Sequence, residues 1–97
     1  MKTTTIIEPT VPSTVIYKFT RDLQKGMTGS DVKQLQIYLN THGYVIAKNG
    51  SGSPGYESTY FGQATKNALI KFQLANHITP AQGYFGAVTK GYVNGMK

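Results

Sequence analysis

Hydrophobic positions recur with a helical period in three stretches of the chain. In the first stretch, Val32, Leu35 and Leu39 fall on one face of a helix. Ser30 is a suitable N-cap for this helix, and Gly43 is suited to end it. The pattern therefore predicts a first helix between these two residues.

Two further helices are predicted towards the C-terminus. The second begins at Gly62 and stops at Asn76, and the third begins at Gly86. The positions predicted to face inward are Ala64, Ala68, Leu69, Phe72 and Ala75 in the second helix, and Val88, Tyr92 and Val93 in the third. The pattern therefore predicts three helices and an all-α fold.

The remaining segments are predicted to be irregular. Residues 1–14 are rich in Thr and Pro and predict a flexible tail or linker, which leaves 15–97 as the folded domain. Residues 47–60 are rich in Gly and Ser and predict a loop.

One short phrase occurs twice: YFGQATK at 60–66 and YFGAVTK at 84–90. In each copy a Tyr-Phe pair precedes a predicted helix, glycine stands at the N-cap, and threonine follows three residues later. Glycine permits a tight entry into the helix, and Phe61 or Phe85 can pack back against the helix that it precedes. A catalytic motif would normally occur once, so the repeat indicates a structural unit used twice.

Charge narrows the choice of partner. The 97 residues carry a formal charge of +6, and the cations are spread singly along the chain. All but Arg21 are lysines, which read bases and phosphates less well than arginines. A basic balance favours an anionic partner. The charge fits nucleic acid and an anionic cell-wall polymer equally well, and the scarcity of arginine disfavours nucleic acid.

Several classes of protein are disfavoured by composition. The chain has no cysteine, which excludes disulfides, thiol nucleophiles and zinc-thiolate sites. No apolar stretch is long enough to span a membrane. Polar residues interrupt the first residues after Met1-Lys2, so we expect no signal peptide in this chain. If the domain acts at the cell envelope, we expect it to arrive there as part of a longer parent protein or through a phage lysis route.

Catalytic chemistry is sparse. A glycosidase needs two carboxylates that flank one bond, and the four carboxylates of this chain, Glu8, Asp22, Asp31 and Glu57, show no such pairing. The two histidines stand at predicted helix ends without a third ligand at metal-like spacing; they are His42 and His77. We therefore expect no enzyme activity, no metal and no cofactor.

The assembled pattern resembles the peptidoglycan-binding domain of bacterial cell-wall hydrolases and phage lysins. Three segments of the sequence carry the resemblance: L..G..GSDV..LQ..LN..GY from Leu23 to Tyr44, YFG..T...L..FQ...HI at 60–78, and G.FG..T at 83–89. The family often has Asp-Gly shortly before Phe-Gly, whereas this chain has Ser58-Thr59 and Gln82-Gly83.

The resemblance implies a compact three-helix bundle with a short internal repeat, preceded here by the extended tail. It also implies noncovalent binding of peptidoglycan, through glycan or stem peptide, as a targeting module beside a linked or associated hydrolase domain. The alternative is a helical protein-protein or nucleic-acid interaction module on the same scaffold, because fold does not fix function.

A ligand site is expected where the two repeated helix starts meet. The turn at 76–83 is short and should bring the third helix back beside the second, with a groove between them. The expected ligand-binding residues are Tyr60, Gly62, Gln63, Tyr84 and Gly86, with Tyr44 and Gln73 as candidate walls and Lys66 and Lys90 at the rim. The alternative for the tyrosines is a partly buried structural role, and for Thr65 and Thr89 it is capping or packing of their own helices.

Overall fold

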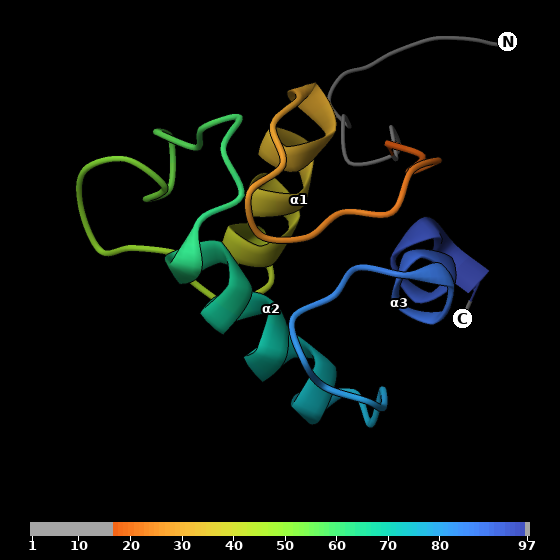
Figure 1. Cartoon of the computed structure of the whole chain (residues 1–97). Coiled ribbons are helices and arrows are strands. Elements are labelled where there is room, and N and C mark those ends of the chain that lie inside the picture. The colour runs from red at the N-terminus through yellow and green to blue at the C-terminus, as the bar shows by residue number, and fades with distance from the viewer. Residues whose placement is uncertain (1–16, 97) are drawn as a thin grey trace, which may run out of the picture.

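The computed structural model describes residues 17–96 and confirms the all-α class (Figure 1). Its elements are the helices α1 (Ser30–Thr41), α2 (Gln63–Ala75) and α3 (Ala87–Gly91), the last continuing into a π-helical segment, η2 (Tyr92–Met96). The predicted tail at 1–14 lies outside the described residues.

The start of α1 corrects one prediction, and its end confirms another. Ser30 is the first helical residue and not the N-cap, which is Gly29 at φ 154. A Cβ on Gly29 would lie 2.6 Å from side-chain atoms of both Arg21 and Asp31, so another residue here would displace this ion pair. At the other end Gly43 has φ 92, and the helix closes there as predicted.

The bounds of α2 agree with the sequence prediction. Gly62 is the N-cap and Asn76 the C-cap. The N–H of Ile78 donates to the carbonyl of Gln73 at 2.9 Å, which ends the helix in a left-handed turn at His77, φ 58. Ile78 is buried, so the apolar contact that accompanies such an ending is present.

The core is built around three phenylalanines. Phe61, Phe72 and Phe85 are buried as predicted, and Phe19 contacts Phe85 edge-on at 4.9 Å between ring centroids. The other buried apolar residues are Leu23, Val32, Leu35, Leu39, Ile46, Ala68, Leu69, Ile78 and Val93. One core therefore joins all the helices.

Some positions predicted to face inward do not. Ala64, Ala75, Val88 and Tyr92 are exposed, whereas Thr65 and Thr89 are buried. The helix starts are rotated so that threonine, not alanine or valine, points inward. The reason is a polar contact inside the core that the apolar pattern could not indicate.

Buried glutamines hold both copies of the repeated phrase, in an arrangement that we call the glutamine clip. Nε2 of Gln36, on α1, donates to the carbonyl of Tyr60 and to Oγ1 of Thr65, both at 2.9 Å, and its Oε1 accepts from the N–H of Ser58 at 2.7 Å. The clip satisfies the polar atoms of the amide inside the core. It ties α1 to the start of α2.

The second clip repeats the first. Nε2 of Gln73, on α2, donates to the carbonyl of Tyr84 and to Oγ1 of Thr89, while its Oε1 accepts from the N–H of Gly83. Gln73 is only 1% exposed, so it holds the frame from inside and does not form the wall of a groove at the surface, as the sequence suggested. The two threonines accept these hydrogen bonds and make no side-chain cap of their own helices.

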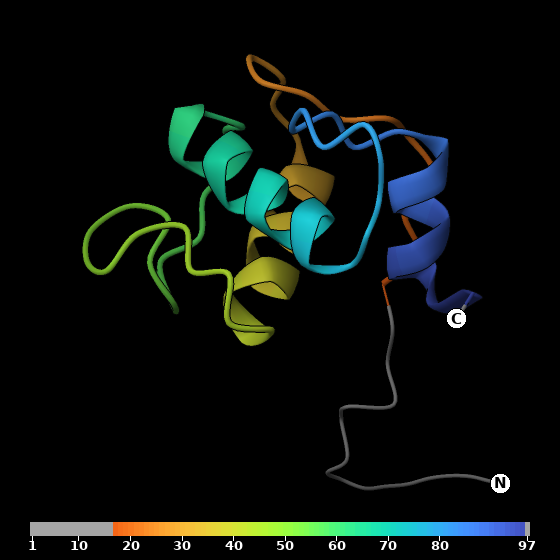
Figure 2. The same ribbon diagram turned by 90° about the horizontal axis from the view of Figure 1, so that it is seen from below.

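The segment before α1 connects the two copies. Leu23 exchanges two backbone hydrogen bonds with Phe85, and Thr28 forms an antiparallel bridge with Tyr60. Both views show this segment between the start of α2 and the start of α3, while the loop at 47–59 projects on the side away from α3 (Figure 2). The loop prediction is confirmed, and the segment at 22–28 positions the site described next.

Candidate functional site

Each copy of the phrase presents one tyrosine ring over one glycine. A Cβ on Gly62 would lie 2.9 Å from the Tyr60 ring, and a Cβ on Gly86 would lie 2.6 Å from the Tyr84 ring. The glycines are therefore needed to seat the rings. Both tyrosines stay about half exposed, 52% for Tyr60 and 45% for Tyr84, which leaves one side of each ring for a ligand.

At the second copy this ring is tied to a carboxylate of the same chain. The hydroxyl of Tyr84 donates to Oδ2 of Asp22 at 2.8 Å, and Nζ of Lys90 lies 2.6 Å from Oδ1. Tyrosine, lysine and aspartate thus close into one network. Asp22 comes from the segment at 22–28, next to Leu23, which pairs with Phe85.

The network shifts two pKa values in opposite directions. The hydrogen bonds from Lys90 and then from Tyr84 hold the pKa of Asp22 below its ordinary value. The bond to the Asp22 carboxylate raises the pKa of the Tyr84 hydroxyl. Around neutral pH the aspartate is therefore ionised and the tyrosine protonated, which is the state that makes the hydrogen bond.

At the first copy the segment at 22–28 contributes a cation and not a carboxylate. Lys25 comes from the same segment, and its Nζ donates to Oε1 of Gln63 at 2.8 Å. Nε2 of Gln63 in turn donates to Asn67. Within residues 17–96 the structure shows no hydrogen bond from the Tyr60 hydroxyl and no ion pair of Lys66.

Lys66 is nevertheless held in place by its stem. A Cβ on Gly83 would lie 2.5 Å from Cγ of Lys66 and 3.2 Å from Ile70, so the lysine stem packs against a bare glycine. Gly83 directly precedes Tyr84. Lys66 therefore lies on α2 where the polypeptide of the second copy passes.

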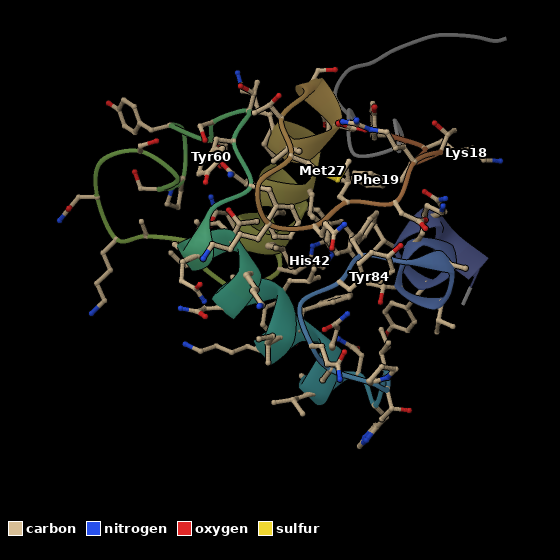
Figure 3. The ribbon with its side chains drawn as sticks, in the orientation of Figure 1. Lys18, Phe19, Met27, His42, Tyr60 and Tyr84 are labelled. Atoms are coloured by element: carbon tan, nitrogen blue, oxygen red, sulfur yellow. The ribbon has the colours of Figure 1, made fainter. Side chains whose placement is uncertain are left out.

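The two tyrosines do not lie against one another. Figure 3 shows Tyr60 above the start of α2 and Tyr84 beside α3, with the segment at 22–28 between them. The sequence predicted that a short turn would bring the two helix starts side by side, whereas the structure places their tyrosines apart. Both starts dock on one segment, at different points along it.

The segment at 22–28 and the starts of α2 and α3 that dock on it make one surface, which we call the candidate face. Five of the expected residues belong to it: Tyr60, Gln63, Lys66, Tyr84 and Lys90. Gly62 and Gly86 support the two rings from below, and Gly86 is itself buried.

Tyr44 lies elsewhere, with its ring edge-on to Phe72 at 5.4 Å. It belongs to an aromatic cluster with Tyr38 and Tyr92, whose rings also meet Phe72 edge-on. Phe72 is more than two helical turns from the start of α2, so Tyr44 does not join the face.

The residues considered for catalysis remain apart. Asp22 is bound by Tyr84 and Lys90, whereas Glu57 accepts a hydrogen bond from Asn40. His42 contacts the carbonyl of Tyr38 and stacks on its ring. Among residues 17–96, no three His, Cys, Asp or Glu side chains gather as a metal site, and no helix is long and apolar enough to cross a membrane.

Two residues of the face were missed in the sequence. Asp22 and Lys25 precede the first helix and match no catalytic pattern. The only signal was their position, because Asp22 stands just before the run that begins at Leu23 and Lys25 stands within it. Their roles depend on contacts with Tyr84, Lys90 and Gln63, which are distant in sequence.

Comparison with known proteins places this architecture in a family. A family model described as a putative peptidoglycan binding domain matches residues 28–91. The SleB N-terminal domain is 30% identical, with a TM-score of 0.64 over 79% of this chain and 93% of that chain.

A peptidoglycan-binding protein from Clostridioides difficile, solved in complex with glutamine hydroxamate, is also 30% identical, with a TM-score of 0.62. The match covers 79% of this chain and 42% of that longer chain. No sequence among curated proteins matches this one.

The family match extends over α1, α2, both copies of the repeated phrase and both glutamine clips. This confirms the resemblance seen in the sequence. The chain belongs to the family of peptidoglycan-binding domains.

Proposed function

We propose that this domain binds bacterial cell-wall peptidoglycan noncovalently through the face built on the segment at 22–28 and the starts of α2 and α3. The family match carries the proposal, because it spans α1, α2 and both copies of the phrase. The solved relative from Clostridioides difficile, itself a peptidoglycan-binding protein, supports it.

The geometry is suited to binding a ligand without reacting with it. Tyr60 and Tyr84 pack over glycine, and this contact reduces the side-chain entropy that is lost when a ligand packs on the rings. Their hydroxyls and the lysines around them offer polar contacts. The domain acts as a binding module that delivers a wall-active parent protein or an associated hydrolase domain to the cell envelope.

Sedimentation with purified, insoluble peptidoglycan of several chemotypes tests this function. The domain should pellet with walls and stay in solution without them. Tyr60→Ala should pellet less. Tyr56→Ala is the matched control, because Tyr56 is 71% exposed and lies on the loop at 47–59, so it reports the loss of any exposed ring. A domain that stays in the supernatant with every chemotype contradicts the proposal.

The alternative is an interaction module for nucleic acid or protein. The formal charge of +6 is the observation that favours it. Charge-driven binding to nucleic acid weakens steeply with salt. Wall binding should persist at about 0.5 M salt, where electrostatic screening is short-ranged. Retention on DNA with loss of wall binding under the same conditions would favour the alternative.

A further inference from the structure

We propose that the first copy of the phrase binds a free carboxylate of the peptidoglycan stem peptide, in the position that Asp22 occupies at the second copy. This inference rests on the proposed function and names the part of the ligand that is recognised. Tyr60 and Lys66 are the residues that receive the carboxylate, and Lys25 adds positive charge beside it.

The two copies have the same local frame. Gly62 has φ −102 and ψ −169, and Gly86 has φ −102 and ψ −161. A tyrosine ring lies over each glycine, and each glutamine clip grips the tyrosine carbonyl from below.

The lysines also start from equivalent places. The N–H of Lys66 donates to the carbonyl of Gly62 at 3.0 Å, and that of Lys90 to the carbonyl of Gly86 at 2.8 Å. Each lysine therefore leaves its helix one turn beyond the glycine under the tyrosine ring. The same tyrosine and lysine positions thus recur in both copies, and at the second copy the two side chains meet at one carboxylate.

The second copy shows what this pair of donors binds. Asp22 offers one oxygen to the Tyr84 hydroxyl and the other to the Lys90 ammonium. A single carboxylate satisfies both groups. The bonds also hold the pKa of Asp22 down, as expected where a carboxylate is stabilised in its charged form.

The first copy has the donors without the carboxylate. Phe85 exchanges both of its backbone hydrogen bonds with Leu23, the neighbour of Asp22, whereas Phe61 bonds to the N–H of Gly26 and the carbonyl of Met27. The charged side chain that the segment at 22–28 contributes to the first copy is Lys25, whose Nζ donates to Gln63. Among the described residues no carboxylate is bonded to Tyr60 or Lys66, and the segment brings positive charge there.

Stem peptides supply the matching chemistry. They carry carboxylates, and a carboxylate has the two oxygens that Tyr84 and Lys90 bind in Asp22. The exposed ring of Tyr60 can pack against the peptide or sugar next to that carboxylate. Other wall anions, such as polymer phosphate, are distinguished in the test below.

The test compares a soluble disaccharide-peptide fragment that has free carboxylates with the same fragment amidated at those carboxylates. Calorimetry or chemical-shift titration gives both affinities. The free fragment should bind about tenfold more tightly than the amidated one, as expected for hydrogen bonds to a charged group. Lys66→Gln and Tyr60→Phe should each remove most of that preference.

Two exposed positions outside the site provide matched controls. Lys71→Gln on α2 and Tyr56→Phe on the loop at 47–59 make the same chemical changes, and they should leave the preference unchanged. Equal affinity for the two fragments, or equal losses in the two pairs of variants, would overturn the inference.

Two further outcomes separate the possible failures. If the wild-type domain does not pellet with walls, the proposed function fails. If it pellets with walls but shows no preference for free carboxylates, only this inference fails. Loss of pelleting after acid removal of phosphate-containing polymers would also overturn the inference, because polymer phosphate would then be the anion bound.

Discussion

The two copies of the repeated phrase agree inside the protein and differ at its surface. Inside, each has a buried phenylalanine, a buried threonine and a glutamine clip. Outside, Asp22 is bonded to the tyrosine and lysine of the second copy, whereas Lys25 of the same segment is bonded to Gln63 of the first. The repeat therefore preserves a way of starting a helix, and each start can carry its own surface chemistry.

The largest effects should come from the phenylalanines that the copies share. Phe61→Ala and Phe85→Ala each leave a cavity in the core and should cost about 3–5 kcal/mol of unfolding free energy. Urea denaturation followed by circular dichroism measures both. Similar losses would support equivalent roles inside, and a variant that unfolds at the wild-type urea concentration would break the equivalence.

The glutamine clips should come next. Gln36→Met and Gln73→Met keep the volume but leave buried N–H, carbonyl and hydroxyl groups without partners, at a cost of about 2–3 kcal/mol each. The same denaturation experiment applies. Lys71→Met is a control on an exposed position of α2. A stable Gln36→Met protein would show that the clip is dispensable.

Variants of the two exposed tyrosines should differ in their affinity for the wall, although the core variants of the two copies behave alike. Tyr60→Ala should weaken wall binding by about 1–3 kcal/mol, as for an anchoring aromatic residue. Tyr84→Ala should weaken it less, because the Tyr84 hydroxyl is already bound to Asp22. Wall sedimentation at increasing peptidoglycan gives the affinities, and melting curves verify the fold. A larger loss for Tyr84→Ala would reverse the assignment of the two copies.

The smallest expected effect is the pH dependence of stability that comes from Asp22 at the second copy. The pKa of Asp22 is lowered on folding, so its contribution to stability is present above the ordinary value of 3.8 and is lost as the pH falls through the lowered pKa. An NMR titration of the Asp22 carboxyl carbon should give a midpoint below 3.8, and Lys90→Gln should move it upward. A midpoint that Lys90→Gln leaves unchanged would contradict the network.

The sequence predicted what depends on local pattern. The C-terminal end of α1 followed from Gly43, and the two ends of α2 followed from Gly62 and Asn76, because glycine and asparagine favour the backbone geometry of helix ends. The three core phenylalanines followed from their place in the pattern.

The polar core could not be predicted in the same way. Gln36 and Gln73 are buried, but an apolar stripe marks only hydrophobic residues as buried and therefore does not indicate them. Their hydrogen-bond partners are also far along the chain. The link of Asp22 to Tyr84 and Lys90 likewise joins residues more than 60 positions apart. Such pairs are set by the tertiary fold, so local spacing gives no signal for them.

Chemical-shift mapping with a soluble disaccharide-peptide fragment is the most direct test of where this domain binds the wall. We expect the largest shifts at Tyr60, Gln63 and Lys66, with smaller shifts at Tyr84 and Lys90. Shifts concentrated instead on the cluster of Tyr38, Tyr44 and Tyr92 around Phe72 would contradict it.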